Sequence, residues 1–176
     1  MSHPIKKTTK EILSINQKRD SPLKSDFILW AHNIRSLHNV GALFRSSDSF
    51  GISELLLSGF TPVPPRPEIS KTALGAEEYV PWRFIHSCQN ESKKLKNTGY
   101  TIFGLEQTHT SELLTEMKVY TNKNCLILGN EVTGLDDNLL PLIDRFVEIP
   151  QFGEKHSLNV SVAAGIALYA FLSKLI

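Results

Sequence analysis

The sequence predicts an α/β fold with one mostly parallel sheet and helices on both of its faces. Short apolar runs alternate along the chain with segments of helical periodicity, which is the pattern of strand–helix–strand units. A chain of 176 residues has the usual size of one compact domain. Its hydrophobic fraction of 41% can supply a core, and this value together with a charged fraction of 21% excludes a disordered chain.

Six strands are expected, because six short apolar runs are bounded by polar or turn-forming residues. They cover residues 27–31, 54–57, 82–85, 100–105, 125–128 and 146–149. The first run, from Phe27 to Ala31, is bulky and continuous, as in a buried strand. The last run is closed by Pro150, which has no backbone N–H to offer to a sheet.

Three helices are expected between or after these strands. They cover residues 40–50, 89–97 and 157–175. Gly51 and Gly99 follow the first two, and glycine commonly terminates helices. The third is expected to be the longest. Residues 61–67 contain four prolines and no periodicity, so we expect a loop there.

Basic side chains gather in residues 1–25, which carry six lysines and arginines against two acidic residues. The whole chain has a formal net charge of +1, so residues 26–176 are slightly acidic. We therefore divide the chain into a basic N-terminal arm or helix, residues 1–25, and a main domain, residues 26–176. A basic arm can contact phosphate groups, although such runs are more commonly solvated surface.

Several classes of protein are disfavoured by what the sequence lacks. No apolar run reaches the length of about 18 residues that a membrane span needs, and residues 1–20 have no apolar core of a secretory signal. The two cysteines, Cys88 and Cys125, show no metal-ligand spacing, so neither a metal nor a disulfide is expected. These features favour a cytoplasmic protein without membrane contact. The dinucleotide fingerprint, the phosphate loop and the nucleophile elbow are also missing.

Three polar segments follow expected strands, where the ligand sites of parallel sheets lie. The first contains Asn39, at an expected helix N-cap, and Arg45, a cation in an apolar-rich helix that needs a partner or an anionic ligand. The second contains Gly129, which lets a ligand approach the backbone, and Glu131, a carboxylate at a strand end. Capping and an ordinary turn are the structural alternatives for these two segments.

The third segment runs from Ile149 to the expected start of the last helix. Either Ser157 or Asn159 can cap that helix, which leaves the other side chain for a ligand. His156 lies beside them, but the sequence supplies no partner that would make it a base, so a non-catalytic role is favoured.

Together these segments resemble the motifs of the SpoU/TrmH family of RNA ribose methyltransferases, within the SPOUT superfamily. The first is similar to motif one at Asn39, Gly41, Arg45 and Phe50–Gly51. The second is similar to the Gly–Asn–Glu turn of motif two, with Val132–Thr133 as a departure from the common Glu–Gly–x–Gly. The third is similar to motif three, in which Ile–Pro precedes Ser–Leu–Asn–Val–Ser. The resemblance covers about residues 26–176, and residues 71–78 and 99–105 also resemble the family.

The resemblance implies a fold, a cofactor and a substrate. The C-terminal segment is expected to form a trefoil knot around S-adenosylmethionine. The cofactor-binding residues implied are Gly104, Leu105, Gly129, Ile149, Ser157 and Leu158. The catalytic residues implied are Asn39, Arg45, Glu131 and Asn159. The expected substrate is the ribose 2′-hydroxyl of tRNA or rRNA, and the expected assembly is a homodimer.

In the family Arg45 is credited with activating the hydroxyl. Because arginine is a poor base, we prefer a role in which its cation stabilises the developing alkoxide and holds the adjacent phosphate. Asn39 and Asn159 would orient the ribose and the arginine, and Glu131 would pair with Arg45 or fix the motif-two loop. The alternatives are a non-catalytic RNA-binding protein that keeps the fold and a knotted RNA base methyltransferase, and the set of motif residues favours ribose over both.

Overall fold

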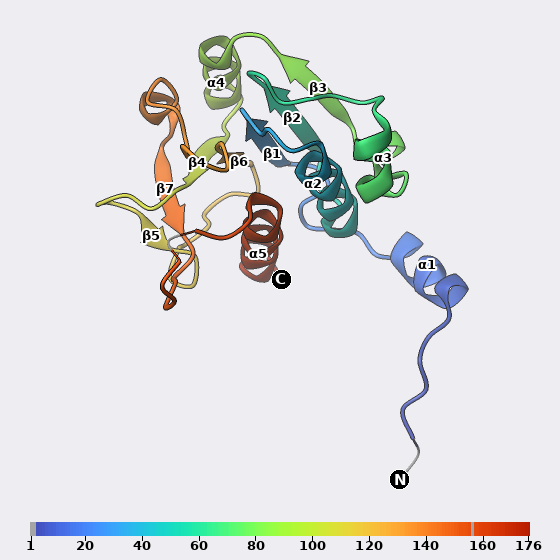
Figure 1. Ribbon diagram of the computed structural model, residues 1–176. Helices are drawn as coiled ribbons and strands as arrows, with labels where there is room; N and C mark the ends of the chain where they lie inside the picture. Colours follow the sequence, from blue (N-terminus) through green and yellow to red (C-terminus); the bar gives the residue numbers. More distant parts are fainter. Residues whose placement is uncertain (1–2, 156) are drawn as a thin grey trace.

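The computed structural model describes residues 3–155 and 157–176. Within these ranges, seven parallel strands form one sheet in the order β3-β2-β1-β6-β4-β7-β5 (Figure 1). The strands are β1 (Phe27–His32), β2 (Glu54–Ser58), β3 (Trp82–Ile85), β4 (Thr101–Leu105), β5 (Glu112–Leu113), β6 (Asn124–Leu128) and β7 (Arg145–Glu148). The predicted α/β class with a parallel sheet is confirmed, although the short edge strand β5 was not predicted.

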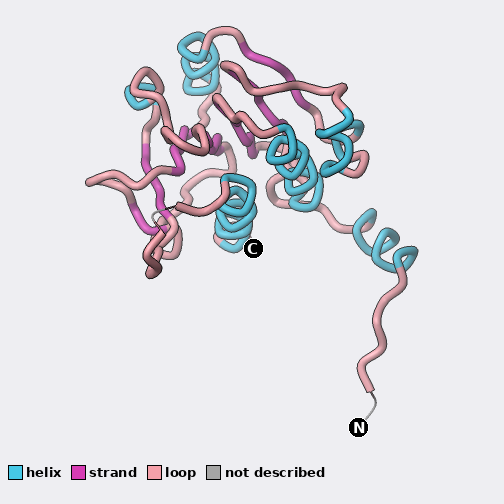
Figure 2. The backbone as a smooth tube through the Cα atoms, in the orientation of Figure 1, coloured by secondary structure: helices cyan, strands magenta, loops and turns pink. Residues whose placement is uncertain are grey.

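Five α-helices accompany the sheet in the same ranges. They are α1 (Thr9–Gln17), α2 (Leu37–Phe50), α3 (Pro67–Ala73), α4 (Cys88–Asn97) and α5 (Val160–Ser173). Helices α2 and α5 contact each other over one face of the sheet, whereas α4 covers the other face (Figure 1). Long loops follow β6 and β7, and the second of them leads into α5 (Figure 2).

The two faces of the sheet carry separate hydrophobic cores. Along β1, Phe27 and Leu29 belong to the core beneath α2 and α5, and Ile28 and Trp30 belong to the core beneath α4. A strand covered on both faces needs apolar side chains at every position. This requirement explains why the run in β1 is continuously apolar rather than alternating.

Two helix boundaries differ from the prediction because other residues cap the helices. Helix α2 begins at Leu37, since the Ser36 hydroxyl accepts a hydrogen bond from the Asn39 N–H at 3.3 Å. Asn39 is therefore not the N-cap, and its side chain is free for other contacts. Helix α5 begins at Val160 and not at residue 157, because Asn159 caps it by accepting from the Ser161 N–H at 2.9 Å. Both helices have 14 residues, so α5 is not the longer one.

Helix α3 begins at the end of the proline-rich segment and was not predicted. Its first residue, Pro67, suits the first turn of a helix, where the missing N–H has no partner to lose. Helix α3 packs tightly against α2 at Gly41. A Cβ on Gly41 would collide with the Ile69 carbonyl oxygen and the Thr72 hydroxyl. The glycine of the first motif therefore permits close contact between two helices.

Helix α1 stands apart from the sheet (Figure 1). The Thr8 hydroxyl and the Glu11 carboxylate form a capping box at its start, yet none of its residues is buried. Ile12 and Leu13 are exposed on it. None of the helices in residues 3–155 and 157–176 has both the length and the apolar character needed to cross a membrane.

Candidate active site

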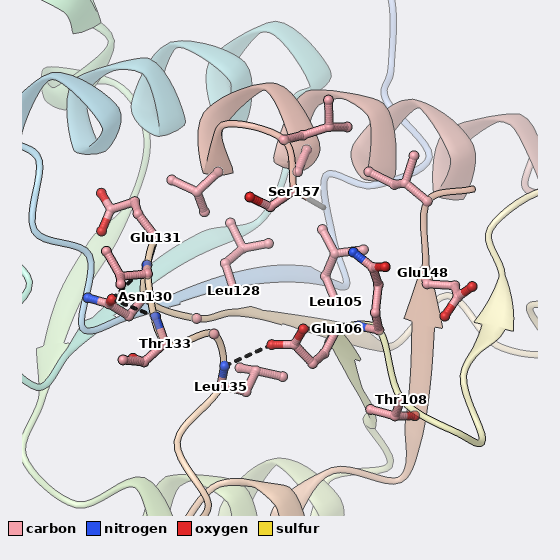
Figure 3. Close-up of a pocket in the computed structure, with 18 of the residues that line it drawn as sticks. Leu105, Glu106, Thr108, Leu128, Asn130, Glu131, Thr133, Leu135, Glu148 and Ser157 are labelled. Carbon is pink, nitrogen blue, oxygen red and sulfur yellow. Dashed lines mark hydrogen bonds between the residues drawn. The ribbon is translucent and has the colours of Figure 1, made fainter. Parts of the chain in front are cut away.

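A cavity of about 780 Å³ lies at the carboxyl ends of β4, β6 and β7, beside the first turn of α5 (Figure 3). Because all strands are parallel, these ends meet at one edge of the sheet, which is the usual place for a ligand. The volume falls within the range of small-molecule sites. Apolar side chains from Leu105, Leu128, Leu135, Ile149 and Leu158 contribute to its lining.

Five of the six residues expected to bind the cofactor line this cavity. They are Leu105, Gly129, Ile149, Ser157 and Leu158. Gly104 does not line it and is buried within β4. A Cβ on Gly104 would lie 2.8 Å from Ile143 Cδ1 and 2.9 Å from Leu135 Cδ1, so this glycine makes room for the core beneath α4. The sequence could not distinguish a packing glycine from a ligand-facing one.

The Gly–Asn–Glu segment forms a tight turn after β6. The backbone of Asn130 exchanges two hydrogen bonds with Gly134, at 2.9 and 3.0 Å. A Cβ on Gly129 would collide with the Gly134 backbone, so the turn itself requires this glycine. The Asn130 side chain accepts from the backbone N–H groups of Val132 and Thr133, at 2.9 and 3.1 Å. Val132 and Thr133 are the residues that depart from the common motif, and the Asn130 side chain holds their backbone in place.

The Glu131 carboxylate connects this turn to the loop that follows β1. It accepts hydrogen bonds from the Arg35 N–H at 2.9 Å, the Ser36 N–H at 3.2 Å and the Asn39 side-chain amide at 2.8 Å. Burial acts to raise the pKa of Glu131, but these donors outweigh it, and the pKa lies below its ordinary value. The carboxylate therefore binds the start of the first motif segment. These contacts do not include Arg45, so they do not support the alternative in which Glu131 pairs with it.

Asn39 and Asn159 extend this connection to the third segment. The Asn159 amide donates to the Asn39 side-chain oxygen at 3.1 Å, while the Asn159 oxygen caps α5. Side chains from all three motif segments therefore form one chain of hydrogen bonds, from Glu131 through Asn39 to Asn159. Asn159 is the residue that caps the last helix, and Ser157 remains at the cavity.

Arg45 lies outside the cavity. It is exposed on α2 and lines a second hollow of about 530 Å³ between α2, α3 and α5, together with Lys71. The first turn of α5 separates the two spaces, because Val160 lines the cavity and Ser161 lines the hollow. In the described part of the chain no side chain or carbonyl pairs with the Arg45 guanidinium. The sequence suggested that Arg45 needs a partner, but the residue is exposed to solvent and remains available to an anionic ligand.

Two further features of the site were missed in the sequence. Glu106 follows β4 directly and lines the cavity, and a carboxylate just after a predicted strand was a signal that could have identified it. Asp136 holds the loop after β1, because its Oδ2 lies 2.7 Å from the Asn33 amide nitrogen and 3.0 Å from His32 Nε2. No local pattern marked this contact, which joins residues 103 positions apart.

His156 lies outside the described residues, so the structure says nothing of its role. Among the residues that are described, no group of three or more histidine, cysteine or acidic side chains could hold a metal ion.

The SpoU rRNA Methylase family model matches residues 26–169. The chain therefore belongs to this family, and the resemblance seen in its motifs is confirmed. A tRNA (guanosine(18)-2'-O)-methyltransferase of Aquifex aeolicus is 30% identical over 168 residues, which cover 94% of this chain and 75% of that protein. The tRNA (guanosine(18)-2'-O)-methyltransferase TARBP1 of Mus musculus is 33% identical over 149 residues, 84% of this chain but only 9% of the mouse protein.

Known structures agree with this assignment. The crystal structure of the A. aeolicus TrmH/SpoU tRNA modifying enzyme superposes with a TM-score of 0.77 at 26% identity, over 88% of this chain and 77% of that one. The shared architecture is the α/β domain with its parallel sheet, so the cavity lies on a scaffold common to the family.

Replacing Glu131 by glutamine should lower the free energy of unfolding by about 1–3 kcal/mol at pH 7, because one N–H donor loses its acceptor and the others lose a charged acceptor. A lowered pKa in the folded state stabilises the fold at pH values above the ordinary pKa of the carboxyl group, and this contribution is lost as pH falls through the lowered value. The difference between wild type and Glu131→Gln should therefore shrink in acid. Urea unfolding at about pH 7 and pH 3.5 measures it.

The matched control is Glu154→Gln, which removes the same charge from an exposed position. It should leave the free energy of unfolding within about 0.5 kcal/mol of wild type. A Glu131→Gln protein as stable as wild type at pH 7 would show that the carboxylate does not hold the two loops together.

Proposed function

We propose that this chain is an RNA ribose 2′-O-methyltransferase that uses S-adenosylmethionine. The observation that carries the proposal is a chain of hydrogen bonds that starts at Glu131 in the cavity lining and passes through Asn39 to Asn159. Asn159 in turn accepts from Ser161, which lines the hollow that contains Arg45. Membership of the SpoU family and relatives named as tRNA and rRNA 2′-O-methyltransferases support it. The substrate class is tRNA or rRNA.

The cavity fits S-adenosylmethionine in size and chemistry. Its apolar walls suit an adenine ring, and the strand ends at Leu105, Gly129 and Ile149 present backbone groups that can recognise polar edges. Ser157 adds a hydroxyl, and Leu158 adds apolar surface. When bound, the cofactor supplies an activated methyl group on a positively charged sulfur.

Arg45 acts as a fixed cation on the RNA. In the hollow beside Lys71 it holds the phosphate next to the target ribose and stabilises negative charge on the 2′-oxygen as the proton leaves. The proton passes to the phosphate or to solvent, since arginine does not give up its own proton at neutral pH. Asn39 and Asn159 position the ribose at the boundary of the two spaces, and Glu131 holds Asn39 in place.

Incubating the protein with RNA and S-adenosylmethionine, followed by mass spectrometry of the digested nucleosides, tests the function. A 2′-O-methylnucleoside supports it. A methyl group on a base ring, or RNA binding without any methylation, would instead support the two alternatives.

Three further properties belong to the proposal. The chain after β7 returns past the ends of β4 and β6 to bring α5 against α2, and this path suits the trefoil knot expected from the family. No metal takes part in the reaction. The reaction takes place in the cytoplasm, since Cys88 and Cys125 are both free thiols, as in a reducing compartment.

Arg45→Ala should reduce the single-turnover rate by about 10²–10³, as for loss of one oxyanion-stabilising donor. Arg45→Lys keeps the charge but loses the planar fork, so it should retain more activity than the alanine variant. Cofactor affinity and the melting temperature should stay close to wild type in both, because Arg45 is exposed and outside the cavity. Equal inactivity of the two variants, with intact folding and binding, would contradict the role as a cation.

A homodimer through α5 is proposed because this helix exposes an apolar stripe. Val162, Ile166 and Tyr169 follow one another at helical spacing and are 51%, 41% and 64% exposed. Ile166→Glu should halve the mass measured by light scattering at micromolar concentration, since a dimer would have to bury the new charge. Asn97→Glu, a change at an exposed position on α4, should leave the dimer intact. A wild-type mass near the 19.7 kDa of one chain would overturn the proposal.

The basic segment that includes α1 is proposed to bind RNA phosphates. Lys6, Lys7 and Lys10 are exposed on it, and no residue of α1 is buried against the domain. Deleting residues 1–10 should weaken RNA binding and flatten its dependence on salt, because fewer counterions are released. Cofactor affinity should not change. RNA affinity equal to that of the full chain would mean that the segment is only solvated surface.

A further inference from the structure

The charged side chains that line the cavity are acidic. Among the described residues that line it, none is a lysine or an arginine, whereas Glu106, Glu131 and Glu148 are all present. His109 is the only other ionisable side chain in the described lining, and it is exposed at the rim. Whatever occupies the cavity therefore meets a negative potential that no nearby cation of the lining cancels.

Two of these carboxylates are turned away from the centre of the cavity. Glu131 is directed to the loop after β1, where three donors hold it. Glu148 is directed to the other side, where it accepts a hydrogen bond from the Ser111 hydroxyl (Figure 3). These two carboxylates are set apart by their direction, since Glu106 also accepts hydrogen bonds from the protein.

Glu106 also lines the cavity, and its carboxylate lies between Leu105 and Leu135 (Figure 3). Its Oε2 accepts from the Leu135 N–H and its Oε1 from the Gln107 N–H, each at 3.0 Å. A Cβ on Gly134 would collide with Oε2, so the turn after β6 leaves room for this carboxylate. Both donors are uncharged peptide groups, and they fix the position of the carboxylate without neutralising its charge.

Resting on the function proposed above, we propose that Glu106 makes the site selective for the charge of the cofactor. S-adenosylmethionine carries a net positive charge, because its sulfonium and ammonium groups outnumber its carboxylate, whereas S-adenosylhomocysteine has lost the sulfonium and is neutral. A carboxylate held in a partly enclosed cavity attracts the first ligand more strongly than the second. Glu106 thereby favours binding of the methyl donor and release of the demethylated product.

Titration calorimetry with S-adenosylmethionine and S-adenosylhomocysteine, without RNA, tests the proposal. Wild type at low salt should bind the methyl donor about tenfold more tightly, and the ratio should fall as sodium chloride rises from about 0.05 to 0.5 M. Glu106→Gln keeps an oxygen for the Leu135 N–H but removes the charge. It should lose most of the ratio by weakening the methyl donor, with the affinity for S-adenosylhomocysteine changed less than about twofold.

Two controls separate charge from structure. Glu106→Asp keeps a carboxylate and should keep most of the preference for the methyl donor. Glu116→Gln removes the same charge from an exposed position outside the cavity and should leave both affinities unchanged.

An unchanged ratio in Glu106→Gln, or equal weakening of both ligands, would overturn the charge selection while leaving the proposed function in place. Equal weakening would assign Glu106 to a group that both ligands share. Failure of wild type to bind either ligand would overturn the cofactor assignment itself, and the charge selection with it. If Glu106→Gln does not fold, the wild-type affinities and the Glu106→Asp protein still decide, because wild type that binds the neutral ligand as tightly as the cationic one contradicts the proposal.

Discussion

The Glu131 carboxylate holds together two loops that leave different strands of the sheet. One loop follows β1 and begins α2, and the other is the turn after β6. Neighbouring strands bring these loops close, but hydrogen bonds in the sheet end where the strands end. Beyond that edge, the carboxylate supplies acceptors for two backbone N–H groups and for the Asn39 amide. The orientation of the Asn39 amide depends on this anion, and Asn39 in turn accepts from Asn159, which is also held by its cap on α5.

The arrangement also explains why the motif residues differ so much in burial. Glycines at the helix contact and in the turn serve close packing, and they would be needed whatever ligand the site held. Asn39 and Asn159 use part of their hydrogen-bonding capacity to connect the motif segments. The Arg45 guanidinium has no protein partner among the described residues, and its exposure keeps it available. The glycines and asparagines of the motifs are therefore held by contacts within the protein, whereas the Arg45 cation is left available for a ligand.

Much of this could be predicted from the sequence, because it depends on local patterns. The apolar runs identified six strands, and the parallel sheet then placed Leu105, Gly129 and Ile149 at one edge. What escaped prediction depends on contacts between distant residues. Gly104 makes room for Ile143 and Leu135 in the core, and Asp136 reaches back to the loop after β1. Neither leaves a local signal, since the partner lies on another element and the spacing in the sequence is arbitrary.

Helix α1 can change in sequence with little effect on the stability of the domain. None of its residues is buried, so it adds nothing to the hydrophobic core that stabilises the sheet. Substitutions in α1, or its exchange for another module, therefore cost the domain little stability, because the core contacts remain. The residues of β1 and the buried residues of α2 have no such freedom, since they form the core of the domain. This end of the chain can thus change in sequence and surface charge while the core and the site stay as they are.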